Sequence, residues 1–424
     1  MNEHDSERVA GLLESHGYTR TTAIDEADVV VLNTCAIREN ADNRLYGTLG
    51  QLKRTKEQRP AMRIAVGGCL VQKDKQLVLA KAPWVDVAFG TFAVGELPHL
   101  LGRRERTGLP AFEFREQTDV FPSALPARRE QPFHAWVAVS VGCDNSCTFC
   151  IVPFVRGPQV SRPMDDVVKE VRRLVDDGVV EVTLLGQNVN TYGRDLDGRA
   201  LFADLLRALD RVEGLRRLRF TSPHPHDFTP DVIDAMAASP SVCEHIHFPL
   251  QSGSDRILAR MRRSYRIERY LGWLERIRSA IPDIAVSTDV IVGFPGESEA
   301  DFAATLEAVE RARFDSAYTF QYSPRPGTAA AEMGDPVPPD LVQERFARLV
   351  EAQERISLER NRAALGTRVE ALIEESGSRK DAARATGRTR TNKLVHLEGR
   401  RRPGEFVDVI VTGAHPHHLD AVPA

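Results

Sequence analysis

The sequence predicts an α/β protein whose centre is a partial (β/α)6 barrel, with a smaller α/β domain before it and a small β-barrel after it. Three observations lead to this prediction. Strand and helix patterns alternate regularly from about residue 133 to residue 362. A shorter alternation of the same kind precedes them, and short strands separated by turns follow them. The chain of 424 residues is long enough for three domains.

The composition excludes several classes of protein. Apolar residues make up 42% of the chain, which is too many for a disordered protein. The net charge of −4 excludes a protein that is basic overall, although a local basic patch is still allowed. No long apolar run occurs and the N-terminal segment is polar and acidic, so we expect no membrane span, no secretory signal and a cytoplasmic location. Clustered cysteines in the cytoplasm are metal ligands more often than disulfides.

The first α/β domain is predicted over residues 1–105. Strand patterns occur at 28–32, 62–66 and 84–89, and helical patterns occur at 6–15 and 39–58. Residues 106–132 contain four prolines and no periodic pattern, which predicts a linker.

Two cysteines of this domain, Cys35 and Cys69, each lie just past the end of a predicted strand. Open α/β sheets place their ligand sites at these ends. Considered alone, two cysteines in a small domain are more often buried thiols.

The partial barrel is predicted over residues 133–362, with its catalytic face at the carboxyl ends of the strands. A helix over 165–177 places its valines on one face and stops before Gly178. Ser298 and Asp301 have the spacing of a capping box, which predicts the start of another helix. The six strand candidates are 134–141, 179–185, 216–221, 244–249, 284–292 and 317–322.

The third domain is predicted over residues 363–424 as a β-barrel with strands at 367–373, 393–397 and 405–411. Between residues 376 and 402, nine basic residues stand against two acidic ones, a local net charge of +7. Basic β-barrels with exposed loops often bind nucleic acids, and a solvated loop surface is the alternative. The candidate RNA-binding residues are Arg379, Lys380, Arg384, Arg388, Arg390, Lys393, Arg400, Arg401 and Arg402.

The most informative motif is Cys143-x-x-x-Cys147-x-x-Cys150, which follows the first barrel strand. Cysteine thiolates hold iron–sulfur clusters, usually four for each 4Fe-4S cluster. Three thiolates on one loop therefore predict a 4Fe-4S cluster whose fourth iron is open to a cofactor or substrate. The alternative is a structural zinc site, which would require a fourth cysteine or histidine.

This loop resembles that of the radical S-adenosylmethionine (SAM) superfamily, and Phe149 occupies the aromatic position that packs near the cofactor there. The resemblance implies that SAM binds the open iron and is cleaved on reduction to methionine and a 5′-deoxyadenosyl radical. Over essentially the whole chain, the sequence resembles the methylthiotransferase family, and most of all its tRNA-2-methylthio-N6-dimethylallyladenosine synthase branch, including a C-terminal TRAM-type domain. The segments that carry this resemblance are 141–153, 185–190, 249–254, 288–297 and 322–328.

Polar side chains in these segments follow the predicted strands and could hydrogen-bond an amino acid or a ribose. Ordinary loop capping is the alternative for each of them. The candidates for cofactor binding are Gln187, Asn188, Ser252 and Asp289, besides Phe149.

In the family, the first domain holds a second 4Fe-4S cluster through three cysteines, and Cys35 and Cys69 match two of them. The remaining cysteine belongs to the pattern Cys-x-x-Asn-x-x-Asp-Ser. The end of this pattern matches Asn2, Asp5 and Ser6, so the cysteine would fall before Met1. We therefore expect an incomplete auxiliary cluster and a flavodoxin-like domain that lacks its first strand.

The resemblance implies that this enzyme adds a methylthio group to carbon 2 of N6-isopentenyladenosine beside the anticodon of tRNA. It also implies an electron donor such as flavodoxin or ferredoxin and a sulfur donor, and we expect a monomer. One alternative is a methylthiotransferase for threonylcarbamoyl-adenosine in tRNA or for a ribosomal-protein aspartate, although the basic segment favours RNA. The other is a non-catalytic iron–sulfur protein that binds RNA or senses redox state.

The remaining cysteine and the histidines are given structural roles. Cys243 precedes an apolar strand and matches no ligand position, so we expect a buried packing thiol. We expect packing and hydrogen bonding, in preference to metal binding, for the histidines at positions 224, 226, 245 and 247, and no metal role for those at 415, 417 and 418.

Overall fold

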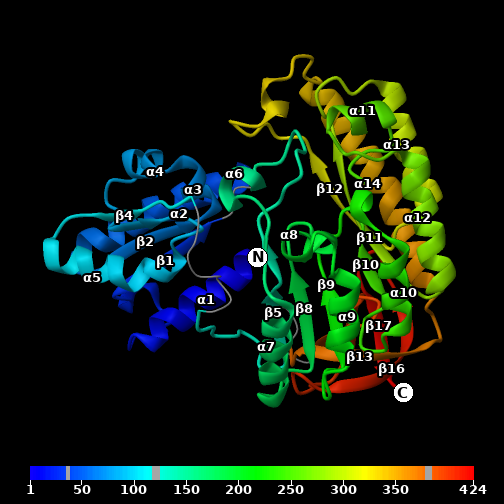
Figure 1. The fold of residues 1–424 in the computed structure, drawn as a ribbon, viewed down its shortest axis with the longest axis horizontal. Helices are drawn as coiled ribbons and strands as arrows, with labels where there is room; N and C mark the ends of the chain where they lie inside the picture. Colours follow the sequence, from blue (N-terminus) through cyan, green and yellow to red (C-terminus); the bar gives the residue numbers. More distant parts are fainter. Residues whose placement is uncertain (35–38, 117–124, 378–383) are drawn as a thin grey trace. The chain divides into compact units, whose positions relative to one another are not determined.

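The computed structural model describes residues 1–34, 39–116, 125–377 and 384–424. Contacts between residues divide the chain into two compact units (Figure 1). The first unit comprises residues 1–130, 140–145 and 150–162, and the second comprises residues 131–139, 146–149 and 163–424. Three predicted site residues, Cys35, Arg379 and Lys380, lie outside the described residues.

The first unit contains a four-stranded parallel sheet whose strands lie side by side in chain order: β1 (Val29–Thr34), β2 (Arg63–Gly68), β3 (Val87–Phe89) and β4 (Ala111–Glu113). Successive residues of β2 enter different cores, because side chains alternate between the faces of a sheet. Ile64 shares a core with Leu49, and Ala65 shares another with Leu97. The helices are α1 (Asn2–Ser15), α2 (Glu39–Gln58), α3 (Cys69–Asp74), α4 (Gln76–Lys81) and α5 (Leu97–Thr107), with short turns η1 (Ile24–Glu26) and η2 (Val94–Glu96).

The linker predicted over residues 106–132 is partly wrong. Residues 111–113 form β4, which pairs with β3, and Ala111 is fully buried. A strand of three residues next to Pro110 is too short to show the alternation by which strands are recognised. β1 pairs directly with β2, and no strand lies between them among the described residues.

A second small sheet belongs to the same unit. It consists of β6 (Ser140–Val141) and β7 (Val160–Ser161), which pair in antiparallel fashion. Helix α6 (Val152–Arg156) lies between them in the chain.

The second unit confirms the prediction of a six-stranded partial barrel. Three parallel strands, β5 (His134–Ala138), β8 (Glu181–Leu185) and β9 (Arg217–Phe220), form one sheet. Three more, β10 (His245–His247), β11 (Ala285–Val292) and β12 (Ser316–Gln321), form another. A parallel bridge pairs Leu218 of β9 with Val242, which precedes β10 in the chain.

The helices of this unit follow the apolar patterns of the sequence. Val167 and Val171 of α7 are fully buried, and the predicted capping box of Ser298 and Asp301 is present at the start of α13. The helices are α7 (Met164–Asp176), α8 (Arg194–Asp197), α9 (Phe202–Asp210), α10 (Pro230–Ala238), α11 (Asp255–Arg260), α12 (Ile267–Ala280), α13 (Glu299–Ala312) and α14 (Pro339–Arg362), with turns η4 (Val189–Thr191), η5 (Pro225–Asp227) and η6 (Ala329–Glu332).

The C-terminal residues form a closed five-stranded barrel, where the sequence predicts only three strands. β14 escapes sequence prediction because its residues, RATGRT, are not apolar in alternation. Gly387 in β14 permits the barrel to close, since a Cβ there would lie 2.8 Å from the Leu372 carbonyl oxygen. In barrel order the strands are β13 (Arg368–Glu375), β14 (Arg384–Thr389), β15 (Leu394–Glu398), β17 (Leu419–Pro423) and β16 (Phe406–Ala414).

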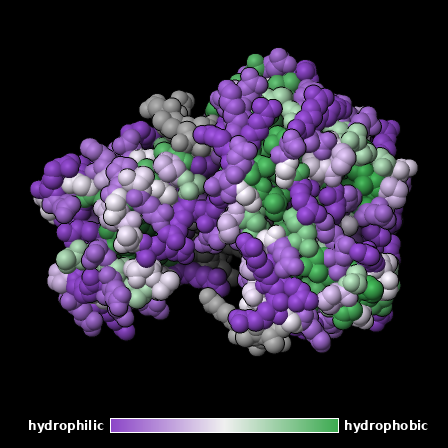
Figure 2. Space-filling view, turned by 90° about the horizontal axis from the view of Figure 1, so that it is seen from below, coloured by the Kyte–Doolittle hydropathy of each residue, from purple (hydrophilic) through white to green (hydrophobic). Residues whose placement is uncertain are grey.

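Within the described residues, no helix has the length and apolar character needed to cross a membrane. The second unit, on the right of Figure 2, shows hydrophobic side chains at the surface between hydrophilic ones. Its most exposed large hydrophobic side chains include Tyr318 and Leu196.

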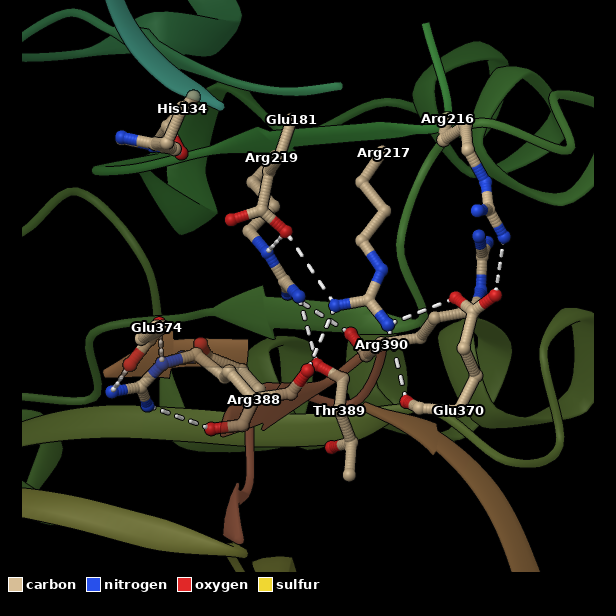
Figure 3. Close-up of polar contacts among 12 residues, drawn as sticks. His134, Glu181, Arg216, Arg217, Arg219, Glu370, Glu374, Arg388, Thr389 and Arg390 are labelled. Atoms are coloured by element: carbon tan, nitrogen blue, oxygen red, sulfur yellow. Dashed lines mark hydrogen bonds and ion pairs between the residues drawn. The ribbon is translucent and has the colours of Figure 1, made fainter. Parts of the chain in front are cut away.

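The C-terminal barrel contacts the amino-terminal end of the central barrel through arginines that begin the central strands (Figure 3). Arg217, the first residue of β9, is fully buried and donates to the Glu370 carboxylate at 2.9 Å and to the Arg388 carbonyl at 2.8 Å. Arg219 donates to the Thr389 carbonyl at 2.8 Å and to Glu181 at 2.9 Å. The two barrels are therefore joined by buried, charge-assisted hydrogen bonds at the end opposite the strand carboxyl ends.

Candidate active site

The cysteine loop begins directly after β6. Gly142 has a φ of +84°, and a Cβ there would lie 1.9 Å from the Pro158 carbonyl oxygen. Only glycine fits this position, because an L side chain meets both backbone strain and a clash. The Cys143 N–H donates to the Gly157 carbonyl at 3.1 Å. These contacts, all within the first unit, fix the loop at its first cysteine.

The three cysteines of the loop have thiols that are partly exposed and outside any disulfide. Cys143 and Cys150 belong to the first unit and Cys147 to the second. Such thiols fit an iron–sulfur cluster, because thiolates are its usual ligands and exposure leaves access for a cofactor.

The segment around Cys147 is held in the second unit by the end of α11. The Thr148 hydroxyl donates to the Arg260 carbonyl at 2.9 Å, and the Thr148 N–H donates to the Met261 carbonyl at 3.1 Å. Phe149 packs against an apolar cluster that includes Ile257 and Phe294. The described contacts of Phe149 therefore give it a packing role in the loop, and its predicted contact with a cofactor stays a prediction.

One residue of this region, Arg263, belongs to no motif of the sequence. Its side chain is buried, and its Nη1 lies 3.5 Å from the Cys147 sulfur. The neighbouring residues, Arg262 and Ser264, are exposed. Met261 and Tyr265, each two residues from Arg263, are hydrophobic and buried, and this spacing is the sequence signal that Arg263 faces inward.

Polar side chains after β8 and β9 are held together by hydrogen bonds. The Asn188 amide donates to Asp227 at 2.8 Å. Asn190 binds the backbone of His224 twice, accepting from its N–H at 2.7 Å and donating to its carbonyl at 3.1 Å. These bonds fix the two loops against each other at the carboxyl ends of their strands.

Two buried polar atoms in these loops have no hydrogen-bond partner among the described residues, namely Asn188 Oδ1 and His224 Nε2. Burial and the nearby Arg263 cation lower the pKa of His224 to about 2, so the imidazole is neutral. Its Nδ1 accepts the His226 N–H at 3.2 Å, which leaves the proton on Nε2. An acceptor and a donor are therefore left unused, as expected where a polar ligand completes the site. Gln187, which precedes Asn188, is half-buried.

The predicted cofactor-binding residues Ser252 and Asp289 differ in their surroundings. Ser252 is 1% exposed, and its hydroxyl is 3.3 Å from the Thr305 hydroxyl and accepts the Ser254 N–H at 3.2 Å. In the structure the Ser252 side chain therefore connects its loop to α13. This contact fits the alternative of loop capping and not the predicted contact with a cofactor. Asp289 lies within β11, half-buried, with Oδ2 3.2 Å from His247 Nε2.

The region around Cys69 is buried in the first unit. Cys69 begins α3 directly after β2 and packs against Ile151 and Val155. Close to it, Arg156 and Asp5 form a buried ion pair. Burial raises the pKa of Asp5, but the Arg156 guanidinium outweighs this effect and holds the pKa well below its usual range. Cys69 is the one auxiliary-cluster candidate that the structure describes, because Cys35 lies outside the described residues.

The cysteine expected to pack is buried, as predicted. Cys243 is 2% exposed, and burial raises the pKa of its thiol. It therefore stays protonated, which suits a packing thiol and not a metal ligand.

Several basic residues predicted to bind RNA are engaged within the chain. Arg390 pairs with Glu244 at 2.8 Å, Arg388 with Glu374 at 2.9 Å, and Lys393 with Asp315 at 3.0 Å (Figure 3 shows Arg388 and Arg390). Arg384 pairs with Asp420. In contrast, no carboxylate of the described residues lies within 4.0 Å of the side chains of the run 400–402, in which the first and last residues are exposed.

One group of possible metal ligands is found among the described residues, in the C-terminal barrel. The donor atoms of His415, His418 and Asp420 lie within 4.8 Å of one another. Arg384 already pairs with Asp420, and the two histidine rings stack with their planes 14° apart. Because the Arg384 guanidinium already binds the Asp420 carboxylate, a metal cation there would be repelled by a like charge. We therefore assign no metal site to this group.

Neutral buried histidines predict that the protein loses stability in mild acid. Burial and the Arg219 cation lower the pKa of His245 to about 3, against an ordinary value of 6.5. The unfolded chain therefore binds a proton that the folded chain does not, and folding weakens as the pH falls below 6.5. The expected slope is about 1.4 kcal/mol per pH unit for each such histidine.

Urea unfolding at pH 7, 6 and 5, followed by tryptophan fluorescence, would measure this slope. We expect His245→Gln to reduce it and His417→Gln, an exposed control, to leave it unchanged. An equal slope in wild type and His245→Gln would contradict the prediction.

Family models match three parts of the chain. Residues 137–309 match the Radical SAM superfamily, residues 1–90 match the uncharacterized protein family UPF0004, and residues 362–423 match the TRAM domain.

Two relatives named tRNA-2-methylthio-N(6)-dimethylallyladenosine synthase match nearly the whole chain. The protein of Parafrankia sp. (strain EAN1pec) is 58% identical over 431 residues, which cover 99% of this chain and 87% of that protein. The protein of Acidothermus cellulolyticus is 59% identical over 424 residues, which cover 99% of this chain and 85% of that protein.

Among solved structures, the chain is similar to the radical SAM methyltransferase TsrM from Kitasatospora setae, with a TM-score of 0.58 and 14% identity. The match covers 78% of this chain and 72% of that one. At this level of identity the likeness shows the fold alone.

Proposed function

Because the chain belongs to the tRNA-2-methylthio-N(6)-dimethylallyladenosine synthase family of radical SAM enzymes, we propose that it adds a methylthio group to carbon 2 of N6-isopentenyladenosine beside the anticodon of tRNA. The observation that carries the proposal is the 58% identity to named synthases over 99% of the chain. The identity spans the cysteine loop, the barrel and the TRAM domain together.

The residues of the central barrel have defined tasks in this proposal. Cys143, Cys147 and Cys150 would hold a 4Fe-4S cluster, which with SAM would supply a radical that can remove hydrogen from an unactivated C–H bond. The unpartnered Asn188 Oδ1 and His224 Nε2–H are offered to the cofactor or the substrate base. Each is fixed by its neighbours, so binding requires little reorganisation of the loops. Gln187 and Asp289 remain candidates for cofactor binding because Gln187 follows the barrel strand β8 and Asp289 lies in the barrel strand β11.

The reaction needs components that this chain does not provide. An external one-electron donor such as flavodoxin or ferredoxin would supply the electron for the SAM cluster, and a sulfur donor would replace the transferred sulfur. These partners follow from the chemistry of the proposed reaction.

The activity is tested by anaerobic reconstitution of the protein with iron and sulfide, followed by incubation with SAM, dithionite and tRNA carrying N6-isopentenyladenosine. Mass spectrometry of the digested tRNA should detect the methylthio nucleoside. Product on tRNA carrying threonylcarbamoyl-adenosine, or on a ribosomal-protein aspartate, would reassign the substrate. Absence of SAM cleavage would refute the radical SAM chemistry.

The auxiliary cluster is a separate proposal, in which Cys35 and Cys69 are two of its ligands. We expect Cys143→Ala/Cys147→Ala/Cys150→Ala to lose about four irons per chain, the content of one cluster, and to keep the remainder. Adding Cys69→Ala should remove that remainder. Iron and sulfide analysis after reconstitution measures both steps, and a triple variant without iron would rule out an auxiliary cluster in this chain.

The RNA-binding proposal rests on Arg400, Arg401 and Arg402, because Arg384, Arg388, Arg390 and Lys393 pair with carboxylates of the chain. Replacing the three arginines with alanine should weaken tRNA binding and reduce the slope of log K against log salt by about 2 to 3, since each phosphate contact releases counterion.

Filter binding between 50 and 300 mM salt would measure this slope. The matched control, Lys169→Ala/Arg172→Ala/Arg173→Ala, removes three charges from the exposed face of α7 and should not change the slope. An equal effect of both triple variants would mean that total charge, and not this segment, governs binding.

A further inference from the structure

Arg263 is a buried cation whose polar partners are unusual. Its guanidinium Nη1 lies 3.5 Å from the Cys147 sulfur, and its Nε donates to the Tyr265 hydroxyl at 3.3 Å. The guanidinium carbon lies 5.3 Å from the centre of the Tyr265 ring. No carboxylate of the described residues lies within 4.0 Å of it.

Three other buried arginines of the second unit are neutralised by carboxylates. Arg217 pairs with Glu370 at 2.9 Å, Arg219 with Glu181 at 2.9 Å, and Arg345 with Glu297 at 2.8 Å. A buried charge is costly unless a counter-charge compensates it. The described surroundings of Arg263 therefore lack a carboxylate. Burial raises the pKa of the Tyr265 hydroxyl, which keeps it neutral, so the Cys147 thiol is the neighbouring group that can supply an anion.

The backbone around Arg263 is built to hold it in this position. Arg262 and Ser264 both have positive φ, at +54° and +32°, which is uncommon for residues other than glycine. Such strain persists only where the surrounding structure enforces it. The Tyr265 hydroxyl is 2.9 Å from the Leu250 carbonyl, so Tyr265 fixes Arg263 to the loop after β10.

We propose that Arg263 is a positioning residue for the SAM cluster, in which it donates a hydrogen bond to the Cys147 thiolate and raises the reduction potential of the cluster. This inference rests on the proposed function, which places a cluster on Cys143, Cys147 and Cys150. Reduction adds one electron, taken from the external one-electron donor, to a cluster whose thiolate ligands already make it anionic. A nearby cation and a hydrogen bond to a ligand sulfur stabilise the more negative state, so both raise the potential.

The potential is measured on reconstituted protein in the Cys69→Ala background, so that the signal belongs to the SAM cluster. In an EPR-monitored redox titration, Arg263→Gln should hold as much iron as wild type and show a more negative midpoint potential. Arg263→Lys, which keeps the charge without the planar donor group, should shift less. The neighbouring exposed residue gives the matched control, because Arg262→Gln should leave the potential unchanged.

A wild-type potential in Arg263→Gln with full iron content would overturn the inference and leave the proposed function intact. If Arg263→Gln does not retain its cluster, Tyr265→Phe decides the question, because it removes only the hydroxyl that orients the guanidinium. A more negative potential in Tyr265→Phe supports the inference, and an unchanged one overturns it. Failure of the unsubstituted protein to bind a SAM-cleaving cluster would instead refute the proposed function.

Discussion

Replacing Cys147 with alanine is expected to abolish formation of both 5′-deoxyadenosine and the methylthio nucleoside. The cluster has three protein ligands in the proposed site, and two thiolates do not hold it stably. The thiol is partly exposed, so its loss should not disturb packing. Chromatography with mass spectrometry measures both products, iron analysis measures the cluster, and circular dichroism checks that the secondary structure is retained.

The matched control for this variant is Cys243→Ala. Cys243 is 2% exposed in the core, so its truncation should cost stability, about 1 kcal/mol, and retain the iron and the activity. The two substitutions therefore have opposite expected effects. Normal product formation by Cys147→Ala would show that the cysteine loop is not the catalytic centre.

Replacing Arg217 with alanine is expected to destabilise the second unit by about 3 kcal/mol, near the lower end of the range for breaking a buried ion pair. Arg217 is fully buried, and it donates to Glu370 and to the Arg388 carbonyl at the contact between the two barrels. The loss stays at the lower end because Glu370 keeps Arg216, at 2.6 Å, and Glu181 keeps Arg219, at 2.9 Å. Urea unfolding measures the free energy.

An exposed ion pair formed by a residue of β13, the strand that carries Glu370, provides the comparison. Arg368 pairs with Asp408 at 2.7 Å, but both side chains are more than half exposed, so Arg368→Ala should cost no more than about 1 kcal/mol. Limited proteolysis should release the C-terminal barrel faster from Arg217→Ala than from Arg368→Ala. Equal stability of the two variants would refute the structural role of the buried pair.

Sequence patterns were sufficient for the central barrel because its elements are long and apolar. The strand predicted at 284–292 is β11, residues 285–292, and the helix predicted at 165–177 is α7, residues 164–176. Short or polar strands could not be predicted from apolar patterns. β4 has only three residues, and β14 carries arginine and threonine where an apolar alternation would be expected.

The residues of the candidate site also differ in whether the sequence alone reveals their role. A local motif marks the three cysteines of the loop, because their spacing is itself the signal. Ser252 has the right position in the sequence, but its hydroxyl contacts Thr305 across the fold. Arg388 and Arg390 read as free cations in the sequence. In the structure Arg388 pairs with Glu374 within the C-terminal barrel, and the contact between the barrels pairs Arg390 with Glu244.

By itself the sequence determined the fold class, the cysteine motif and the family resemblance, because each depends on residues close together in the chain. The tertiary structure alone decided which charges are buried. Arg263 lies 116 positions from Cys147 in the chain and 3.5 Å from its sulfur in space. Electrostatic pairing depends on distance and burial, and neither can be read from the order of residues. Long-range packing therefore gives carboxylate partners to arginines such as Arg217 and places Arg263 against a thiol.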